Sequence, residues 1–200
     1  MAVSLNQAEM VGGVYASDTS ILLLEGCTIT GNRTGDGGDG LSDVGPGLGG
    51  SGGGVFCYSG VVKSCEISQN TTGSGGDAWW DGKRSGPGGD GGGICSMSSQ
   101  LTIVDCFVGW NTTSGGAPKS WGPGGGGNGG EGGGLYCESS SIGLSNCIVE
   151  ANFTGPEAMA RTRIGASWES MGAGVMPDAV AAFAPCRALL KSAFAGSQAT

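Results

Sequence analysis

The chain has 200 residues, 45 of them glycine, and a net charge of −8 at pH 7. So much glycine argues against a helical bundle or a doubly wound α/β enzyme, because glycine weakens the interiors of helices and strands. The acidic balance argues against nucleic acid as a partner, and no apolar run reaches the roughly 20 residues that span a membrane. The absence of histidine removes the commonest general base and a common zinc ligand.

Residues 1–10 contain no basic and apolar leader, so the sequence predicts no signal peptide. The repeat described below begins almost at once, without a segment that could cap it. We therefore expect the sequence to be a piece of a longer chain or an incomplete one.

A tandem repeat of about 40 residues starts at residue 11. Each unit opens with glycines followed by an apolar residue, at Val14, Val55, Ile94, Leu135 and, less clearly, Val175. A cysteine follows in each unit, at Cys27, Cys65, Cys106, Cys147 and Cys186. Because two separate columns keep one period, the sequence predicts structural units stacked in tandem.

Apolar residues alternate around each of these cysteines with the period of a β-strand. One column lies three residues before the cysteine, at Leu24, Val62, Ile103, Leu144 and Phe183. Another lies two residues after it, at Ile29, Ile67, Val108 and Val149. Turn-forming residues break the pattern into segments of a few residues, which is typical of an all-β solenoid with a shared core.

We expect about five coils. Residues 11–154 hold four clear coils with glycine-rich inserts, and residues 155–200 hold either a degenerate fifth coil or a C-terminal cap. From Pro185 onward the pattern also fits a short helix with proline in its first turn.

Two motifs carry a resemblance to a known family. Gly-Gly-Gly-Val at 52–55 and its counterparts at 91–94 and 132–135 resemble a Gly-Gly-Ala-Ile motif, and Ile67-x-x-Asn70 resembles its companion Phe-x-x-Asn. The paired motifs are similar to those of right-handed parallel β-helix repeats of the polymorphic outer-membrane protein and adhesin-like type. The resemblance covers residues 11–154 and implies a right-handed parallel β-helix in an extracellular or cell-surface protein.

An asparagine column stands five residues after the first four cysteines, at Asn32, Asn70, Asn111 and Asn152. One interpretation is an internal ladder of stacked amides. The other is N-glycosylation, because each of these residues opens an Asn-x-Thr sequon. We expect the ladder, since the repeat period already accounts for the asparagines.

The cysteines also have two interpretations. Cys27, Cys65, Cys106 and Cys147 form one structural column and are expected to be buried thiols, although neighbours in a parallel ladder are close enough for disulfides. Bridges from Cys57 to Cys65 and from Cys137 to Cys147 could also cross the core. Cys95 falls one position off the inward pattern, so we expect it to point outward.

Inserts of 19 or 20 residues separate each asparagine from the glycines of the next unit. Their near-constant length suggests either inserts that stack on one another as a side lobe or duplicated disordered loops. Acidic side chains in the inserts form a weak candidate for calcium binding, at Asp36, Asp39, Asp77, Asp81 and Asp90. A solvated acidic loop is the interpretation that we favour.

Exposed aromatic residues are candidates for binding a polysaccharide or surface glycan. The outward row of the repeat contains Tyr15, Phe56 and Tyr136, and the inserts contain Trp79, Trp80 and Trp121. Aromatic rows also arise simply as cross-strand pairs. Because no face collects a convergent set of acidic and basic groups, we expect a non-catalytic repeat module with no cofactor. Carbohydrate binding is the alternative, and polysaccharide cleavage a lesser one.

Overall fold

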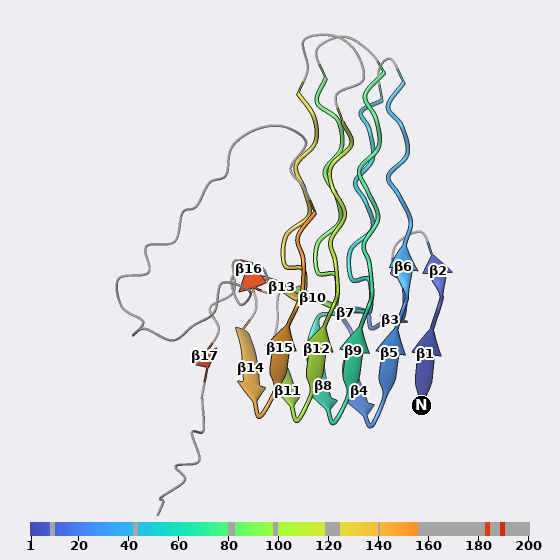
Figure 1. Cartoon of the computed structure of the whole chain (residues 1–200). Coiled ribbons are helices and arrows are strands. Elements are labelled where there is room, and N and C mark those ends of the chain that lie inside the picture. Colours follow the sequence, from blue (N-terminus) through green and yellow to red (C-terminus); the bar gives the residue numbers. More distant parts are fainter. Residues whose placement is uncertain are drawn as a thin grey trace, which may run out of the picture.

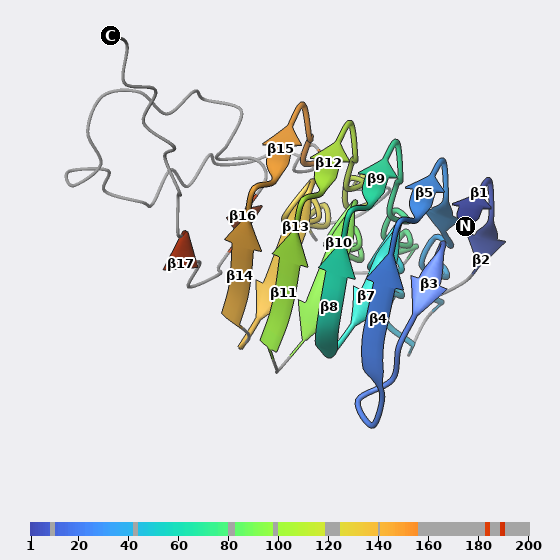
Figure 2. The ribbon, with the colours of Figure 1, turned by 90° about the horizontal axis from the view of Figure 1, so that it is seen from below.

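The computed structural model describes residues 1–8, 11–41, 44–79, 83–97, 100–118, 125–139, 141–155, 183–184 and 189–190. Within these residues the protein is all-β and contains no helix. Every paired strand runs parallel to its neighbour, and Figures 1 and 2 show the strands side by side along one axis.

Three five-stranded sheets make up the strand-bearing body. Sheet 1 contains β1 (Ala2–Ser4), β5 (Thr28–Thr30), β9 (Glu66–Ser68), β12 (Phe107–Gly109) and β15 (Ile148–Glu150). Sheet 2 contains β3 (Val14–Tyr15), β7 (Val55–Cys57), β10 (Ile94–Met97), β13 (Leu135–Glu138) and β16 (Phe183–Ala184). Sheet 3 contains β4 (Ile21–Glu25), β8 (Ser59–Lys63), β11 (Gln100–Val104), β14 (Ser141–Ser145) and β17 (Leu189–Leu190). A separate pair is formed by β2 (Gln7–Ala8) and β6 (Arg33–Thr34).

The chain visits sheets 2, 3 and 1 in turn and then begins again, so each repeat adds one strand to each sheet. The register matches the expected columns across the first four units: Val55 pairs with Ile94, Val62 with Ile103, and Ile67 with Val108. Two columns begin earlier than residue 11, because Val3 pairs with Ile29 in sheet 1 and Gln7 pairs with Arg33.

The register expected for the fifth unit is wrong. Leu135 pairs with Phe183 rather than with Val175, and Leu144 pairs with Leu190 rather than with Phe183. The C-terminal sequence lacks the cysteine-to-asparagine spacing of the other units, so alignment on its cysteine misplaced the strands. The short helix expected from Pro185 is also not what the described residues show there, since Leu189–Leu190 form a strand.

The core is a column of aliphatic side chains inside the three sheets. Alternation along each strand places them on the inner face, as strand geometry requires. The most completely buried are Ile29, Val55, Val62, Ile67, Ile94, Leu101, Ile103, Val108, Leu135 and Ile142. One repeat unit alone would leave its apolar face open, so packing against the neighbouring units supplies most of the hydrophobic stabilisation.

The chain turns between sheets at residues with positive φ. Sheet 3 leads to sheet 1 through Ser64 (φ 52°) and Asp105 (φ 54°). The corner that follows sheet 1 uses Gln69 (φ 57°) and Trp110 (φ 54°). Left-handed backbone costs a residue with a Cβ roughly 1–2 kcal/mol.

Exposed Gln69, with φ 57°, is therefore a site for stabilisation. We expect Gln69→Gly to raise the free energy of unfolding by about 0.5–1 kcal/mol, because glycine relieves the left-handed strain and no buried contact is lost. Chemical denaturation measures this change. A loss of stability would mean that the Gln69 side chain makes a contact worth more than the strain.

The glycine-rich inserts form a second ordered layer, here named the glycine lobe, which rises beyond the edge of the sheets in Figure 1. Each insert has an outgoing limb (35–40, 73–78 and 114–117) and a returning limb (45–52, 84–91 and 125–132). The two limbs of one insert are antiparallel: Gly47 donates to Gly38 O at 2.7 Å and Gly50 to Gly35 O at 3.0 Å. Bonds from Gly37 N–H to Ser74 O at 2.8 Å and from Gly49 N–H to Pro87 O at 3.0 Å join neighbouring inserts, so the described limbs stack on one another.

Hydrogen bonds in the lobe recur every three residues, the repeat of a polyproline II helix. In the second insert, Gly86 donates to Gly76 O and Gly89 to Gly73 O, both at 2.9 Å. The same glycines lie so close to neighbouring limbs that a side chain would not fit: a Cβ on Gly73 would lie 1.7 Å from Gly35 O, and one on Gly89 1.9 Å from Gly50 O. Gly73 and Gly89 therefore have no room for a side chain, whereas the third outgoing limb carries Ser114 and Ala117 at the places equivalent to Gly73 and Gly76.

Candidate functional site

The asparagine column is a continuous amide ladder through the interior. Each side-chain amide donates to the Oδ1 of the next asparagine, from Asn6 through Asn32, Asn70 and Asn111 to Asn152, at 2.9–3.0 Å. Each Oδ1 also accepts the backbone N–H of the preceding asparagine at 3.0–3.1 Å. The ladder thus satisfies side-chain and backbone groups together at every coil.

Asn6 is a ladder member that the sequence analysis missed. It is exposed and lies outside the residues assigned to the repeat, and it is followed by Gln-Ala rather than by a sequon threonine. The signal that could have found it is the run Val3-x-x-Asn6, which matches the Ile67-x-x-Asn70 pattern of later units.

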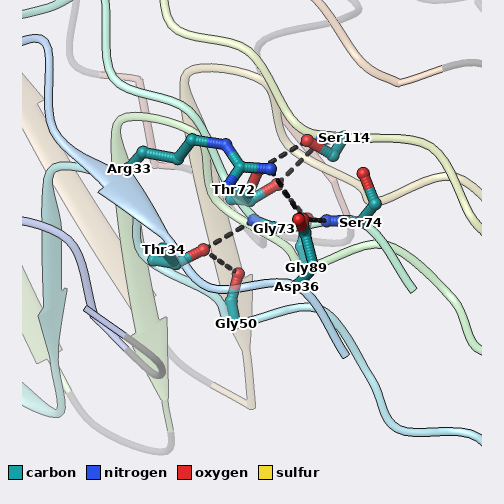
Figure 3. A network of polar contacts seen from close by, with 9 residues as sticks. All are labelled: Arg33, Thr34, Asp36, Gly50, Thr72, Gly73, Ser74, Gly89 and Ser114. Atoms are coloured by element: carbon teal, nitrogen blue, oxygen red, sulfur yellow. Dashed lines mark hydrogen bonds and ion pairs between the residues drawn. The ribbon is translucent and has the colours of Figure 1, made fainter. Parts of the chain in front are cut away.

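A threonine column, also missed, joins the sheets to the glycine lobe. Thr34 donates to Gly50 O at 2.6 Å, Thr72 to Gly89 O at 2.8 Å and Thr113 to Gly130 O at 2.7 Å. Each of these hydroxyls also accepts a backbone N–H from the next insert, as Figure 3 shows for Gly73 at Thr34 and Ser114 at Thr72. All three side chains are fully buried. The sequence signal was the threonine two residues after each asparagine.

The glycosylation interpretation of the sequons does not fit the folded protein. Asn32, Asn70, Asn111 and Asn152 are at most 2% exposed, and their Nδ2 atoms donate to the ladder and to backbone carbonyls. A glycan attached to Nδ2 would remove a donor and need space that the interior does not provide. Asn-x-Thr is here a structural unit, with the asparagine in the ladder and the threonine in the lobe.

Two of the carboxylates proposed for calcium accept hydrogen bonds from the next repeat unit. Asp36 forms an ion pair with Arg33 at 2.6 Å and accepts the Ser74 N–H at 2.7 Å (Figure 3). Asp39 accepts the backbone N–H of Asp77 at 2.9 Å. Among the described residues no group of three or more potential metal ligands comes together. Asp81 lies outside those residues, and calcium binding stays a prediction.

Asp90 is the carboxylate whose environment is most unusual. Its Oδ1 accepts the backbone N–H of Glu131 at 2.7 Å, while its own N–H donates to Ser51 Oγ at 3.0 Å. Burial raises the pKa of Asp90 from 3.8 to about 6, and the charges of Glu131 and Glu138 add to the rise.

This shift predicts a pH dependence of stability. Because the pKa of Asp90 is higher in the folded protein than in the unfolded chain, folding favours the protonated carboxyl. The stabilisation that results is fully present below about pH 4 and is lost as the pH rises through about 6. We expect the wild-type protein to lose about 1–2 kcal/mol through Asp90 over this range, allowing for its partial exposure.

Asp90→Asn keeps an acceptor for Glu131 and removes the charge. We expect this variant to be more stable than wild type at pH 7.5 and equally stable at pH 4, measured by denaturant unfolding at both values. Glu131→Gln should move the pH-dependent loss of stability to lower pH than in wild type, because it removes one of the charges that repel the Asp90 carboxylate. Identical pH profiles for wild type and Asp90→Asn would contradict the assignment.

The column of Cys27, Cys65, Cys106 and Cys147 contains free thiols stacked along the turn before sheet 1. Cys65 Sγ accepts the Cys27 N–H at 3.4 Å, and its thiol donates to Lys63 O at 3.1 Å. A hydrogen bond from Cys106 lowers the pKa of Cys147, the partly exposed end of the column, to about 6, and raises the pKa of Cys106.

The two bridges considered across the core do not form. Cys57, Cys65 and Cys147 are free, whereas Cys137 is disulfide-bonded. Cys95 is fully buried, contrary to the outward exposure expected from its register. It does lie in the outward column with Phe56 and Tyr136, but the returning limb covers it: a Cβ on Gly91 would lie 2.7 Å from the Cys95 Cβ. The sequence analysis did not anticipate a covering layer.

The aromatic row is interrupted at Cys95 and is concentrated at the first two coils. The Tyr15 and Phe56 rings are stacked at 5.7 Å, and Tyr58 meets Phe56 edge-on at 5.8 Å. They lie beside the returning limb of the first insert in a groove of about 550 Å³, and Tyr15 is 58% exposed. Tyr136 lies two strands away from Phe56 in sheet 2.

The tryptophan candidates are only partly described. Trp79 is half exposed and donates from Nε1 to Asp39 Oδ2 at 3.2 Å, whereas Trp80 and Trp121 lie outside the described residues. A polysaccharide or glycan partner stays a prediction.

The comparisons with known proteins give no relative for this chain: no family model, no curated protein and no solved structure matches it. In the part of the chain that the structure describes, no helix is long and apolar enough to cross a membrane.

Proposed function

We propose that the chain is a non-catalytic extracellular or cell-surface repeat module, folded as a right-handed parallel β-helix, that acts as a rigid spacer or adhesin-like shaft. The observation that carries this proposal is how the repeated polar residues are used. Asn70 and Thr72 are fully buried, and all their side-chain bonds run to other coils or limbs. Residues that recur in every coil thus hold the coils together.

The glycine lobe supports the same function. Its limbs bond to the limbs of the neighbouring insert as well as to each other, for example through Gly37 N–H to Ser74 O at 2.8 Å and Gly76 N–H to Gly47 O at 3.0 Å. A spacer resists bending when each repeat unit is hydrogen-bonded to the next at several places around its circumference. The sheets, the asparagine ladder, the threonine column and the lobe supply four such places.

Distance measurement between spin labels tests the spacer proposal. The labels are placed at Thr19, on the first coil, and at Gly143, on the fourth. They are attached through non-canonical amino acids, because the chain has eight cysteines that thiol-reactive labels would also modify. Thr19 is exposed, and a Cβ on Gly143 would meet no atom within 4 Å. We expect one narrow distance distribution that calcium, chelator and an oligosaccharide panel leave unchanged.

A broad distribution would contradict a rigid spacer. The same labels in an Asn111→Leu background provide the matched control, since breaking the ladder should broaden the distribution. Release of reducing or unsaturated ends from any polysaccharide in a broad panel would contradict the non-catalytic part of the proposal.

A further inference from the structure

Returning limbs of the glycine lobe stack in one direction. Each limb donates N–H groups three residues apart to carbonyls of the limb that follows it. Gly49 donates to Pro87 O at 3.0 Å and Gly52 to Asp90 O at 2.9 Å. The next step repeats the pattern, with Gly88 donating to Asn128 O and Gly91 to Glu131 O, both at 2.9 Å. Every returning limb therefore has a donor edge and an acceptor edge.

In the part of the chain that the structure describes, the acceptor edge of the first returning limb is open. By the repeat alignment, Leu48 and Ser51 correspond to Pro87 and Asp90, yet their carbonyls accept no hydrogen bond among the described residues. The cause is a short connection: four residues separate Asn6 from Val11, whereas 19 separate Asn32 from Gly52. The first coil is thus built without the limb that would cover this edge.

The groove described above lies at this edge. It is lined by Val11, Tyr15, Phe56, Tyr58 and the limb 46–51, and its walls are mainly apolar. Leu48 is 70% exposed beside it. We call this groove the limb slot, because it lies where the repeat would place a preceding returning limb.

We propose that the limb slot binds an extended glycine-rich segment of another polypeptide chain. The segment lies parallel to residues 46–52 and donates two N–H groups, three residues apart, to Leu48 O and Ser51 O. The internal contact between the first and second limbs supplies the template. In that contact a Cβ on Gly49 would lie 2.8 Å from Gly89 N, so the first donor position of the bound segment requires glycine.

A labelled peptide with the sequence of residues 44–53 is the probe, because this segment makes the equivalent contact through Gly49 and Gly52 inside the molecule. Fluorescence anisotropy with the full chain is expected to show saturable binding. A peptide with N-methylglycine at those two positions lacks both donors, and we expect it to bind at least tenfold more weakly.

Variants of the full chain locate the site. Tyr15→Ala and Leu48→Glu change exposed side chains at the slot and are expected to weaken binding at least fivefold while melting like wild type. Leu23→Ser, also at an exposed apolar residue but in sheet 3, is the matched control and should bind like wild type. Weakening by Leu23→Ser to the same extent would overturn the assignment of the site.

Equal affinity for the two peptides, or no binding at millimolar peptide, would also overturn the proposal. Binding of an oligosaccharide at the aromatic residues of the slot, without binding of the peptide there, would overturn it as well. None of these results bears on the spin-label distances, so the slot and the spacer can fail separately.

Discussion

Asn111→Leu is expected to lower the free energy of unfolding by about 3–5 kcal/mol. Asn111 is fully buried and lies in the middle of the ladder. Its Oδ1 accepts from the backbone and side chain of Asn70, and its Nδ2 donates to Ile67 O and Asn152 Oδ1. Leucine fills a similar volume but leaves these buried groups without partners, and an unmatched buried polar group costs about 1–3 kcal/mol. Guanidinium denaturation followed by circular dichroism measures the loss.

The control for this variant is Asn6→Leu at the exposed end of the same ladder. Asn6 donates to Asn32 Oδ1, but water can replace the lost partner there. We expect a loss below about 1 kcal/mol. Equal losses at the two positions would mean that burial of the ladder contributes little, and the structural account of the sequons would fail.

Gly73→Ala is expected to cost about 3 kcal/mol or more, since added volume between packed backbones typically costs 1–3 kcal/mol and here also separates hydrogen-bonded limbs. The new methyl group would lie 1.7 Å from the backbone oxygen of Gly35. Moving the limbs apart would break the bonds from Gly73 N–H to Thr34 Oγ1 and from Gly89 N–H to Gly73 O. Denaturation and limited proteolysis of the lobe measure the effect.

Gly38→Ala is the matched control, because a Cβ there meets no atom within 4 Å. We expect its stability to lie within about 0.5 kcal/mol of wild type. If the lobe were a disordered loop, both substitutions would be neutral or slightly stabilising, since alanine restricts the unfolded chain more than glycine does.

The parallel all-β architecture and its register were predictable over the first four units, because cysteine, aliphatic and asparagine columns keep one period. Val62, Ile103 and Leu144 lie in adjacent strands of sheet 3 as that period requires. The fifth unit was not predictable, since its residues do not keep the columns that fix the register. Phe183 therefore pairs with Leu135 and not with Leu144.

The candidate sites were less predictable, because the sequence alone does not show what covers a surface. Burial of Cys95 depends on the returning limb above it, and burial of the sequon threonines depends on the same layer. Glycines three residues apart are present in the inserts. Glycine is so frequent there, however, that the sequence does not show which glycines pack against a neighbouring limb. Only the packing distinguishes Gly73, where an added Cβ would lie 1.7 Å from Gly35 O, from Gly38, where it would meet no atom within 4 Å.

Hydrogen exchange of individual backbone amides, followed by NMR, tests most directly whether the glycine lobe is an ordered, bonded layer. The account predicts that Gly76, Gly86 and Gly89, which donate inside the lobe, exchange as slowly as amides of β11 and β12. Gly38 and Gly45 donate no hydrogen bond among the described residues and should exchange rapidly. Fast exchange at all five glycines would contradict the ordered lobe, and the limb slot and the rigid spacer would lose their structural basis with it.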